Sequence, residues 1–223
     1  MFAKQVDDRP MKDIAIYGAG GFGREVACLL KRINSVSPQW NLLGFFDDGI
    51  TAGTTNEYGS VLGGLEVANE WDRPISVVFA IGSPKVVYRL YESITNPNID
   101  FPNLIAPDVL IVDQDNFSMG KGNIISYGCL FSCNTHIGNF NMFNGFITVG
   151  HDAVVGDFNA FMPSVRISGG VSVGNRNFFG VNSVVLQYIP IGNDTVIGGS
   201  SLIIRKTKDG NTYVGIPAQI VKY

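Results

Sequence analysis

The sequence contains few charged residues for its length of 223 residues. Only 16% of the residues are charged, against roughly a quarter in an average domain, which argues against coiled coils and charged helical bundles. A hydrophobic fraction of 45% is enough for a packed core and argues against disorder. The net charge of −3 gives no general attraction to nucleic acid or acidic lipid, so neither is expected as a partner.

Cysteine, histidine and long apolar runs are also scarce. Three cysteines are an odd number and a poor basis for a disulfide framework, so we expect a reduced, cytoplasmic setting. No apolar run approaches the roughly 20 residues that span a bilayer, and the polar opening MFAKQVDDRPMKD has no stretch of signal-peptide length, so no membrane association is expected. The two histidines, His136 and His151, cannot supply a zinc site of three imidazoles within one chain, so no metal is expected.

The first hundred residues alternate short apolar runs with amphipathic stretches. The pattern predicts buried strands at residues 13–17, 40–46 and 75–81, and helices at 22–33 and 85–94. A short apolar segment, 104–106, is expected to close this series. Strand, helix and strand in this order predict a small Rossmann-like α/β domain with a parallel sheet.

Beyond about residue 107 the helical periodicity disappears and a six-residue repeat replaces it. In a frame that begins at Met119, the first position of fifteen successive hexads is apolar without one insertion. These positions are Met119, Ile125, Phe131, Ile137, Phe143, Val149, Val155, Phe161, Ile167, Val173, Phe179, Val185, Ile191, Ile197 and Ile203. Pairs of an apolar residue and glycine also recur every eighteen residues, so three hexads are predicted to make one coil of a triangular β-solenoid.

A solenoid of this kind carries specific packing expectations. Each apolar first position should point into the prism, which would stack Phe143, Phe161 and Phe179 in one internal column. Glycine at the second position is expected to relax the backbone at the corner between two faces. We therefore expect two domains, a Rossmann-like domain at 1–106 and a β-helix at 107–223.

Several short motifs point to one family. They are GAGGFGREV at 18–26, FFDD at 45–48, AIG at 80–82, VGHD at 149–152 and VGIPA at 214–218. Through these motifs, over about residues 12–223, the chain resembles the hexapeptide-repeat sugar acetyltransferases of the NeuD and PglD type, which acetylate sialic acid or a nucleotide-linked amino sugar. The resemblance implies a left-handed parallel β-helix, a homotrimer with active sites at the subunit interfaces, and acetyl-CoA as co-substrate.

The glycine-rich segment follows the first predicted strand and opens a helix. In that setting glycines let the backbone approach a phosphate, and the helix N-terminus attracts its charge. The dinucleotide fingerprint is matched literally, yet only three or four strands precede the solenoid, too few for both nucleotide-binding halves. Nicotinamide binding, a purely structural glycine turn and a nucleotide-sugar pocket are all open readings. The resemblance favours the pocket, with Gly20, Gly21 and Phe22 at the substrate, although relatives often carry a histidine in place of Phe22.

The resemblance also assigns substrate contacts to residues that follow other predicted strands. Asp47 and Asp48 match acids near the base or ribose of the nucleotide, and Gly82 of the AIG motif is expected at the substrate. The alternative for the two acids is a solvated turn, because Asp48 precedes a glycine in an ordinary turn sequence.

His151 occupies the third position of its hexad and should face outward beside a coil corner. A lone outward histidine is usually only part of the surface. The resemblance makes it the general base, and an imidazole, which titrates near neutral pH, suits removal of a proton from a sugar amine or hydroxyl. Asp152 matches an acid that orients the base, a pairing that requires corner geometry. Asn144 matches an asparagine near the acceptor nitrogen, and its alternative is an asparagine that satisfies a turn.

A thioester under attack develops an oxyanion, which backbone N–H groups at glycine-rich corners can bind. Gly169, one coil after the predicted base, matches the family residue with this role at the acetyl-CoA. Ala160 aligns with a second family histidine near the acetyl carbonyl, so the resemblance places it at the acetyl-CoA, but without that imidazole. Gly180, Val181 and Gly199 match contacts to the pantetheine arm of acetyl-CoA, although the solenoid repeat alone also explains these positions.

Three further residues complete the candidate set. His136 lies fifteen residues before His151 and cannot stack on it in an eighteen-residue coil, so it is interpreted as a surface or trimer-interface residue. Gln219 follows the Gly-x-Pro-Ala segment, where the family often carries a lysine beside CoA. Either Lys222 supplies the charge for the CoA phosphates or that contact is weaker.

The leading hypothesis is acetyl transfer from acetyl-CoA to the amino group of a nucleotide-linked amino sugar in surface-glycan synthesis, with His151 as base. Acetylation of a hydroxyl of sialic acid or another sugar is the enzymatic alternative. A non-catalytic β-solenoid scaffold or nucleotide sensor is the alternative from another class, and it predicts no binding of CoA.

Overall fold

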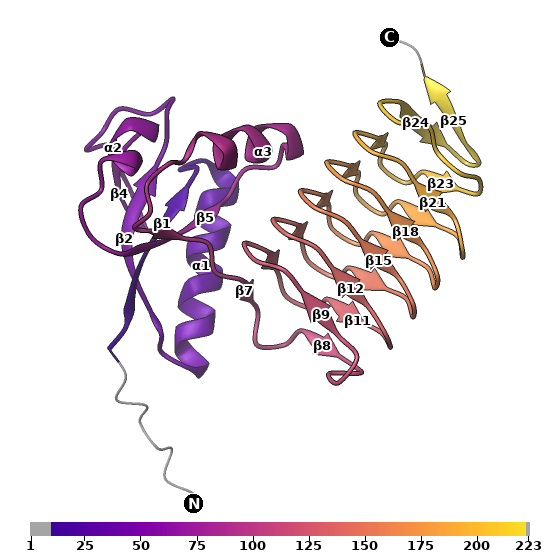
Figure 1. Ribbon diagram of the computed structural model, residues 1–223, viewed down its shortest axis with the longest axis horizontal. Coiled ribbons are helices and arrows are strands. Elements are labelled where there is room, and N and C mark those ends of the chain that lie inside the picture. The colour runs from indigo at the N-terminus through magenta and orange to yellow at the C-terminus, as the bar shows by residue number, and fades with distance from the viewer. Residues whose placement is uncertain (1–9, 222–223) are drawn as a thin grey trace, which may run out of the picture. The chain divides into compact units, whose positions relative to one another are not determined.

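A computed structural model describes residues 10–221 of the chain. These residues divide into two compact units, one made of 10–80 with 93–102 and the other of 81–92 with 103–221 (Figure 1). The domain boundary predicted after residue 106 stays a prediction. Within the described residues, no helix has the length and apolar character needed to cross a membrane.

The first unit is built on a mostly parallel six-stranded sheet with the order β3-β4-β2-β1-β5-β6. Its strands are β1 (Lys12–Tyr17), β2 (Trp40–Phe46), β3 (Thr55–Asn56), β4 (Gly59–Gly63), β5 (Ile75–Phe79) and β6 (Ile99–Asp100), and its helices are α1 (Gly21–Val36) and α2 (Leu65–Asn69). The end of β1 and all of β5 are buried, as expected for central strands that are covered on both faces. The predicted Rossmann-like α/β domain is therefore confirmed.

The main strands and helices lie within a few residues of their predicted positions. Helix α1 buries Val26, Leu30 and Ile33 on one face, which is the periodicity that predicted it. The β3–β4 hairpin and α2 were not predicted, because these short segments are interrupted by glycines and carry no sustained apolar period.

The second unit contains a parallel β-helix, whose three sheets form the faces of a triangular prism. The first face consists of β7 (Leu104–Ile105), β10 (Ile124–Ile125), β13 (Met142–Phe143), β16 (Ala160–Phe161), β19 (Phe178–Phe179), β22 (Val196–Ile197), β24 (Thr212–Gly215) and β25 (Ala218–Val221). The second face consists of β8 (Leu110–Ile111), β11 (Leu130–Phe131), β14 (Thr148–Val149), β17 (Arg166–Ile167), β20 (Val184–Val185) and β23 (Leu202–Ile203). The third face consists of β9 (Ser118–Met119), β12 (His136–Ile137), β15 (Val154–Val155), β18 (Ser172–Val173) and β21 (Pro190–Ile191).

One predicted segment belongs to a different unit from the one expected. Leu104–Ile105 forms β7, which pairs in parallel with β10 on the first face. The prediction that the segment 104–106 closes the α/β series is therefore wrong, and the segment instead begins the solenoid. Its short apolar sequence is equally typical of either kind of strand.

The core of the β-helix follows the six-residue repeat. The rings of Phe143 and Phe161 stack with centroids 4.7 Å apart, and those of Phe161 and Phe179 stack at 4.6 Å. All three side chains are fully buried. The predicted internal column is confirmed, and apolar hexad positions from the three faces surround it in one continuous core.

Three corners join the faces, and each recurs in successive coils. In the coil that contains His151, the first corner lies at residues 144–147, the second at 150–153 and the third at 156–159. The fourth hexad position at these corners adopts the left-handed backbone region, as at Asp152 with φ 57°. The second-position glycines have another role than predicted: a Cβ on Gly150 would lie 2.5 Å from the backbone nitrogen of Gly169, so glycine there permits close stacking of coils.

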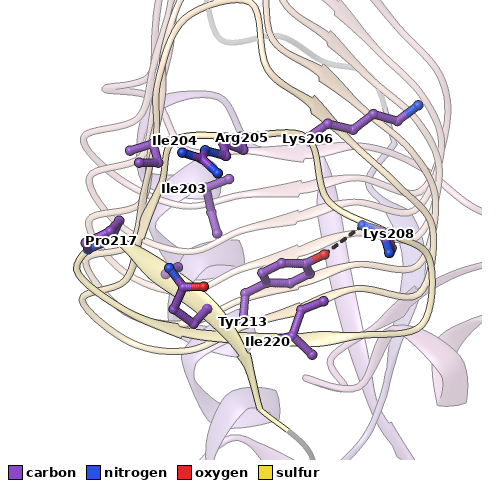
Figure 2. A pocket seen from close by; sticks show the side chains of 10 residues that line it. Ile203, Ile204, Arg205, Lys206, Lys208, Tyr213, Pro217 and Ile220 are labelled. Carbon is purple, nitrogen blue, oxygen red and sulfur yellow. Dashed lines mark hydrogen bonds between the residues drawn. The ribbon is translucent and has the colours of Figure 1, made fainter.

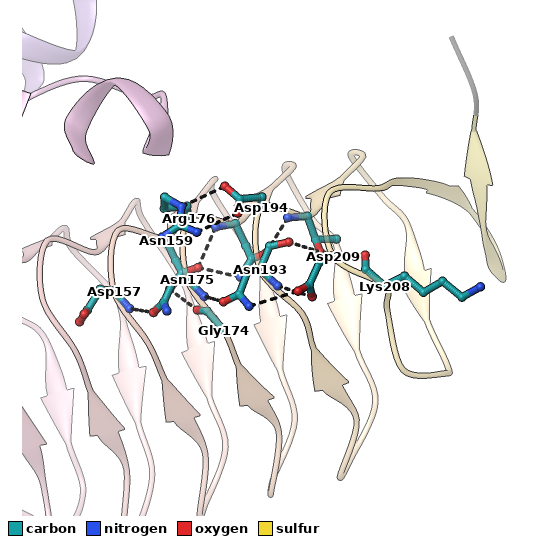
Figure 3. Close-up of polar contacts among 11 residues, drawn as sticks. Asp157, Asn159, Gly174, Asn175, Arg176, Asn193, Asp194, Lys208 and Asp209 are labelled. Carbon is teal, nitrogen blue, oxygen red and sulfur yellow. Dashed lines mark hydrogen bonds and ion pairs between the residues drawn. The ribbon is translucent and has the colours of Figure 1, made fainter. Parts of the chain in front are cut away.

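Polar ladders hold the third corners together. Figure 3 shows Asp157, Asn175, Asn193 and Asp209 in a row, where each backbone N–H donates to the side-chain oxygen of the next residue at 2.7–2.9 Å. A second ladder of buried asparagines runs beside it, as in the 2.8 Å bond from the backbone N–H of Asn141 to Asn123 Oδ1. These bonds satisfy buried polar groups along the whole corner, which favours one register of the coils.

Helix α3 (Pro84–Ser93), predicted at 85–94, packs on the third corners within the second unit as far as Glu92. The ring of Tyr91 lies 4.5 Å from that of Phe140, and Tyr88 lies 5.3 Å from Phe158. Phe140 and Phe158 are stacked on each other at 5.0 Å. The corner aromatics therefore form an apolar platform for the helix.

Candidate functional site

His151 lies at the second corner, between β14 and β15, with an exposed side chain as predicted. Its Nδ1 is 2.8 Å from Oδ2 of Asp152. Neighbouring residues can meet in this way because Asp152 adopts the left-handed backbone region, which turns its side chain toward that of His151. An ionised carboxylate can only accept, so Nδ1 of His151 carries the hydrogen and Nε2 keeps a free lone pair.

Two donors act on the carboxylate of Asp152. The side-chain amide of Asn134 donates to Oδ1 at 2.7 Å, and His151 donates to Oδ2. These hydrogen bonds lower the pKa of Asp152 below its ordinary value, with the bond from Asn134 the larger cause. The carboxylate therefore stays ionised at neutral pH and can hold the imidazole in the form needed of a base. Asn134 was not predicted; its position eighteen residues before Asp152 is the signal that could have identified it.

Gly169 lies directly against the imidazole of His151. A Cβ at this position would be 2.3 Å from Nε2, so only glycine leaves the ring in place. Among residues 10–221 the backbone N–H of Gly169 has no hydrogen-bond acceptor. A free backbone N–H on the residue that packs against the imidazole is a candidate oxyanion donor.

The other predicted catalytic and acetyl-CoA residues lie away from this corner. Asn144, Gly180, Val181 and Gly199 are all at first corners, and Val181 is 50% exposed. Oδ1 of Asn144 accepts the backbone N–H of the next residue at 2.8 Å, which fits the turn role left open for it. A Cβ on Gly180 would lie 2.4 Å from the backbone nitrogen of Gly199, so coil stacking accounts for glycine at residue 180. One chain therefore does not bring these residues to His151.

Ala160 lies in β16 on the first face and is 3% exposed. It pairs with Met142 and Phe178 of the neighbouring coils. Its predicted contact with acetyl-CoA stays a prediction, and its methyl group offers no proton-transfer chemistry.

The glycine loop of the first unit contains two kinds of glycine. A Cβ on Gly23 would lie 1.9 Å from the carbonyl oxygen of Gly18, so the fold itself requires glycine at residue 23. Around Gly20 and Gly21 a Cβ would meet no atom within 4 Å, and neither has positive φ. The interpretation of a purely structural glycine turn therefore explains Gly23 but not Gly20 or Gly21. At these two residues, the close approach of a ligand to the backbone is a physical reason for glycine.

The two acids after β2 accept hydrogen bonds from three other segments of the first unit. Oδ2 of Asp47 accepts the backbone N–H of Ala19 at 2.8 Å, and Oδ1 of Asp48 accepts that of Leu65 at 2.8 Å. Oδ2 of Asp48 also accepts the hydroxyl of buried Tyr17 at 2.7 Å. Burial and this bond raise the pKa of Tyr17. Asp47 thus helps to hold the glycine loop and Asp48 the start of α2, and carboxylate lone pairs remain for a ligand.

Two other predicted substrate residues are partly or fully exposed. Phe22 is half-buried in the first turn of α1, and it places an aromatic ring where a polar side chain was noted in relatives. Gly82 follows β5 and precedes α3, and a Cβ there would meet no atom within 4 Å. Packing of the fold therefore does not dictate glycine at residue 82.

A cavity of about 400 Å³ lies at the C-terminal end of the β-helix (Figure 2). Pro217 and Ala218 of the Gly-x-Pro-Ala segment line it, together with the cations of Arg205, Lys206 and Lys208. Sequence reasoning overlooked these cations, although they stand together as the run RKTK at 205–208. Lys222, the cation considered instead, lies outside the described residues.

No group of three or more metal-ligating side chains occurs in the part of the chain that the structure describes. His136 is exposed, as interpreted from the sequence, and its ring nitrogens lie within hydrogen-bond distance of Ser118 and Asn134.

The chain has the architecture of a two-domain hexapeptide-repeat protein, in which a Rossmann-like domain precedes a left-handed β-helix. Residues 13–94 match the PglD N-terminal domain. The GDP-perosamine N-acetyltransferase of Escherichia coli O157:H7 is 28% identical over 141 residues, which span 63% of this chain and 62% of that relative. These matches and the fold confirm the resemblance to the hexapeptide-repeat sugar acetyltransferases of the NeuD and PglD type that the motifs implied.

Solved structures agree with this architecture. WeeI from Acinetobacter baumannii AYE is 26% identical, with a TM-score of 0.84 over 95% of this chain and 100% of that one. PerB from Caulobacter crescentus, solved in complex with CoA and GDP-perosamine, is 23% identical, with a TM-score of 0.82 over 96% of this chain and 99% of that one. The latter likeness establishes a shared fold.

Proposed function

We propose that the protein transfers the acetyl group of acetyl-CoA to the amino group of a nucleotide-linked amino sugar. The observation that carries the proposal is the second corner, where His151 presents a free Nε2 beside Gly169 while Asp152 holds its Nδ1. The relatives are in accord, because one is a GDP-perosamine N-acetyltransferase and another was solved with CoA and GDP-perosamine.

In the proposed reaction the sugar amine attacks the carbonyl carbon of the thioester. A carbon–nitrogen bond forms, Nε2 of His151 takes the proton that the nitrogen loses, and the N–H of Gly169 binds the developing oxyanion. The carbon–sulfur bond then breaks, and the CoA thiolate leaves with the proton returned from His151. Asp152 stays ionised and stabilises the imidazolium that forms transiently.

The proposed homotrimer explains why the predicted residues occupy two corners. The first corners carry the predicted pantetheine contacts Gly180, Val181 and Gly199, whereas His151 and Gly169 lie at the second corners. An interface between a first corner and a neighbour's second corner therefore completes the proposed site. Arg205, Lys206 and Lys208 give the cavity at the C-terminal end a positive charge that suits the CoA phosphates. The free thiols of all three cysteines fit a cytoplasmic enzyme.

His151→Ala tests the mechanism. Loss of a general base is expected to lower kcat by about 10²–10⁴-fold, while size-exclusion chromatography shows the same assembly as the parent. Thiol release would be assayed with acetyl-CoA and a panel of nucleotide-linked amino sugars, with free sialic acid as the hydroxyl acceptor. Turnover that survives His151→Ala would contradict this base, and calorimetry that detects no acetyl-CoA binding would favour a non-catalytic solenoid.

A further inference from the structure

A chain of side-chain hydrogen bonds leads away from the predicted base and down the β-helix. Asp152 accepts from the amide of Asn134 at 2.7 Å, and Oδ1 of the same amide is 3.2 Å from Nε2 of His136. Nδ1 of His136 is in turn 2.7 Å from the hydroxyl of Ser118. Five side chains from three successive coils are therefore connected, from Ser118 to His151.

The chemistry of the groups fixes the direction of every bond. The carboxylate of Asp152 requires a donor, so the NH₂ group of Asn134 faces it and the amide oxygen faces His136. That oxygen only accepts, so Nε2 of His136 carries a hydrogen, and Nδ1 is left to accept the hydroxyl hydrogen of Ser118. The two histidines are thus held in opposite tautomers, with the hydrogen of His151 on Nδ1 and that of His136 on Nε2.

From this geometry we infer that Asn134 is a positioning residue that acts through Asp152 to orient His151 and fix its tautomer, with His136 and Ser118 holding Asn134. The inference deepens the proposed function, since it rests on His151 as the base. Of the two carboxylate oxygens, Oδ1 is engaged by Asn134, which leaves Oδ2 aimed at the imidazole. Without that second anchor the exposed carboxylate could rotate, and the ring would lose its fixed acceptor.

The backbone at the second corner makes this contact possible. Asn134 and Asp152 occupy equivalent positions one coil apart, and both have left-handed backbones, with φ of 52° and 57°. Asparagine tolerates this conformation better than most residues, and glycine adopts it freely, as Gly170 does at the next coil. Asn134→Gly therefore removes the amide without straining the corner.

The first test reads the tautomers directly and needs no substrate. With only two histidines in the chain, 15N labelling of histidine gives two imidazoles, which are assigned with His136→Gln. At about pH 8, where ordinary imidazoles are neutral, long-range 15N–1H spectra should show His151 protonated on Nδ1 and His136 on Nε2. In Asn134→Gly the His151 signals should move toward a mixture of tautomers.

A matched control separates the amide from the backbone change. Asn182 is exposed at a first corner with φ 58°, so Asn182→Gly makes the same substitution away from the relay and should leave both imidazole spectra unchanged. If His151 keeps its Nδ1–H tautomer in Asn134→Gly, or lacks it in the parent protein, the inference is overturned whatever the enzymatic activity proves to be.

The second test uses kinetics. Loss of an outer partner of a functional histidine is expected to lower kcat about 10-fold, and the KM for acetyl-CoA should stay unchanged because no substrate contact is removed. Since Asn134 acts through Asp152, adding Asn134→Gly to Asp152→Asn should slow the enzyme no further. If the decreases in kcat caused by the two substitutions multiply in the double variant, Asn134 has an independent role and the inference is contradicted.

Discussion

At the scale of single residues, the glycines in the first turn of α1 distinguish what the fold requires from what a bound ligand would require. Gly21→Ala adds a methyl group in open space at the start of a helix, so the melting temperature should stay the same or rise slightly. The methyl would occupy the position where a phosphate or sugar approaches the backbone. We therefore expect the Kd for the nucleotide-linked sugar, measured by calorimetry, to rise at least about 10-fold.

Gly23→Ala is the matched control for this prediction. Its methyl would lie 1.9 Å from the carbonyl oxygen of Gly18, so the helix must shift, at a cost of about 1–3 kcal/mol in the free energy of unfolding. The two variants should thus differ in kind, one losing affinity and the other stability. Tight sugar binding by Gly21→Ala would remove the glycine loop from the proposed site.

Among the elements, the contact of α3 with the third corners includes a charged pair whose pH response is predictable. Arg176 lies over the ring of Tyr88 and donates to both carboxylate oxygens of Asp194, at 3.0 and 2.8 Å. These bonds lower the pKa of Asp194 in the folded protein. The stabilisation is therefore complete above the pKa of the unfolded state, about 3.9, and is lost as the pH falls through the lower folded value.

Asp194→Asn tests this sign. Asparagine tolerates the left-handed backbone at this corner but cannot be protonated, so the melting temperature of the variant should fall less between pH 5 and pH 2.5 than that of the parent. Asp115→Asn is the control, because Asp115 forms no hydrogen bond or ion pair with residues 10–221, and it should leave the pH dependence unchanged. Equal pH dependence in Asp194→Asn and the parent would argue against the pair as a source of stability.

The repeating elements of the fold could be predicted from the sequence, whereas individual polar contacts between elements could not. The stacked column of Phe143, Phe161 and Phe179 was predictable because successive repeats carry an apolar residue at the same position. Asn134 stands one eighteen-residue coil before Asp152, but it was missed because the apolar period does not reveal the left-handed corners at which the two side chains meet. The role of Asp47 in holding Ala19 was missed for a related reason, because a side-chain bond to the backbone leaves no pattern in the sequence.

At the scale of the whole molecule, the positions of the first and second corners of the β-helix have consequences for the proposed trimer. A heterologous interface in a cyclic trimer joins one surface of each subunit to a different surface of the next. The second corner with the proposed base and the first corner with the predicted pantetheine contacts would be two such surfaces in the proposed trimer, and Val181 contributes an exposed apolar side chain to the latter. A site shared between two subunits allows two inactive variants to complement each other, which a site within one chain does not allow.

Two inactive variants should restore activity when they are combined in one trimer. His151→Ala removes the proposed base at the second corner, and Val181→Glu places a charge at the first corner where the pantetheine arm is expected to lie. In trimers reassembled from equal amounts of both, an interface is intact when one subunit supplies His151 and its neighbour supplies Val181. Each condition holds for half of the subunits, so about a quarter of the parental activity should return.

The control is a mixture of the same two variants without dissociation and reassembly, which should stay inactive because no shared interfaces form. Size-exclusion chromatography of each variant beforehand ensures that both still assemble. If reassembled mixtures also remain inactive while parental protein treated identically recovers, the base and the predicted acetyl-CoA corner act within one chain. In that case the separation of the two corners in the β-helix would have to be bridged by the length of the acetyl-CoA arm and not by a neighbouring subunit.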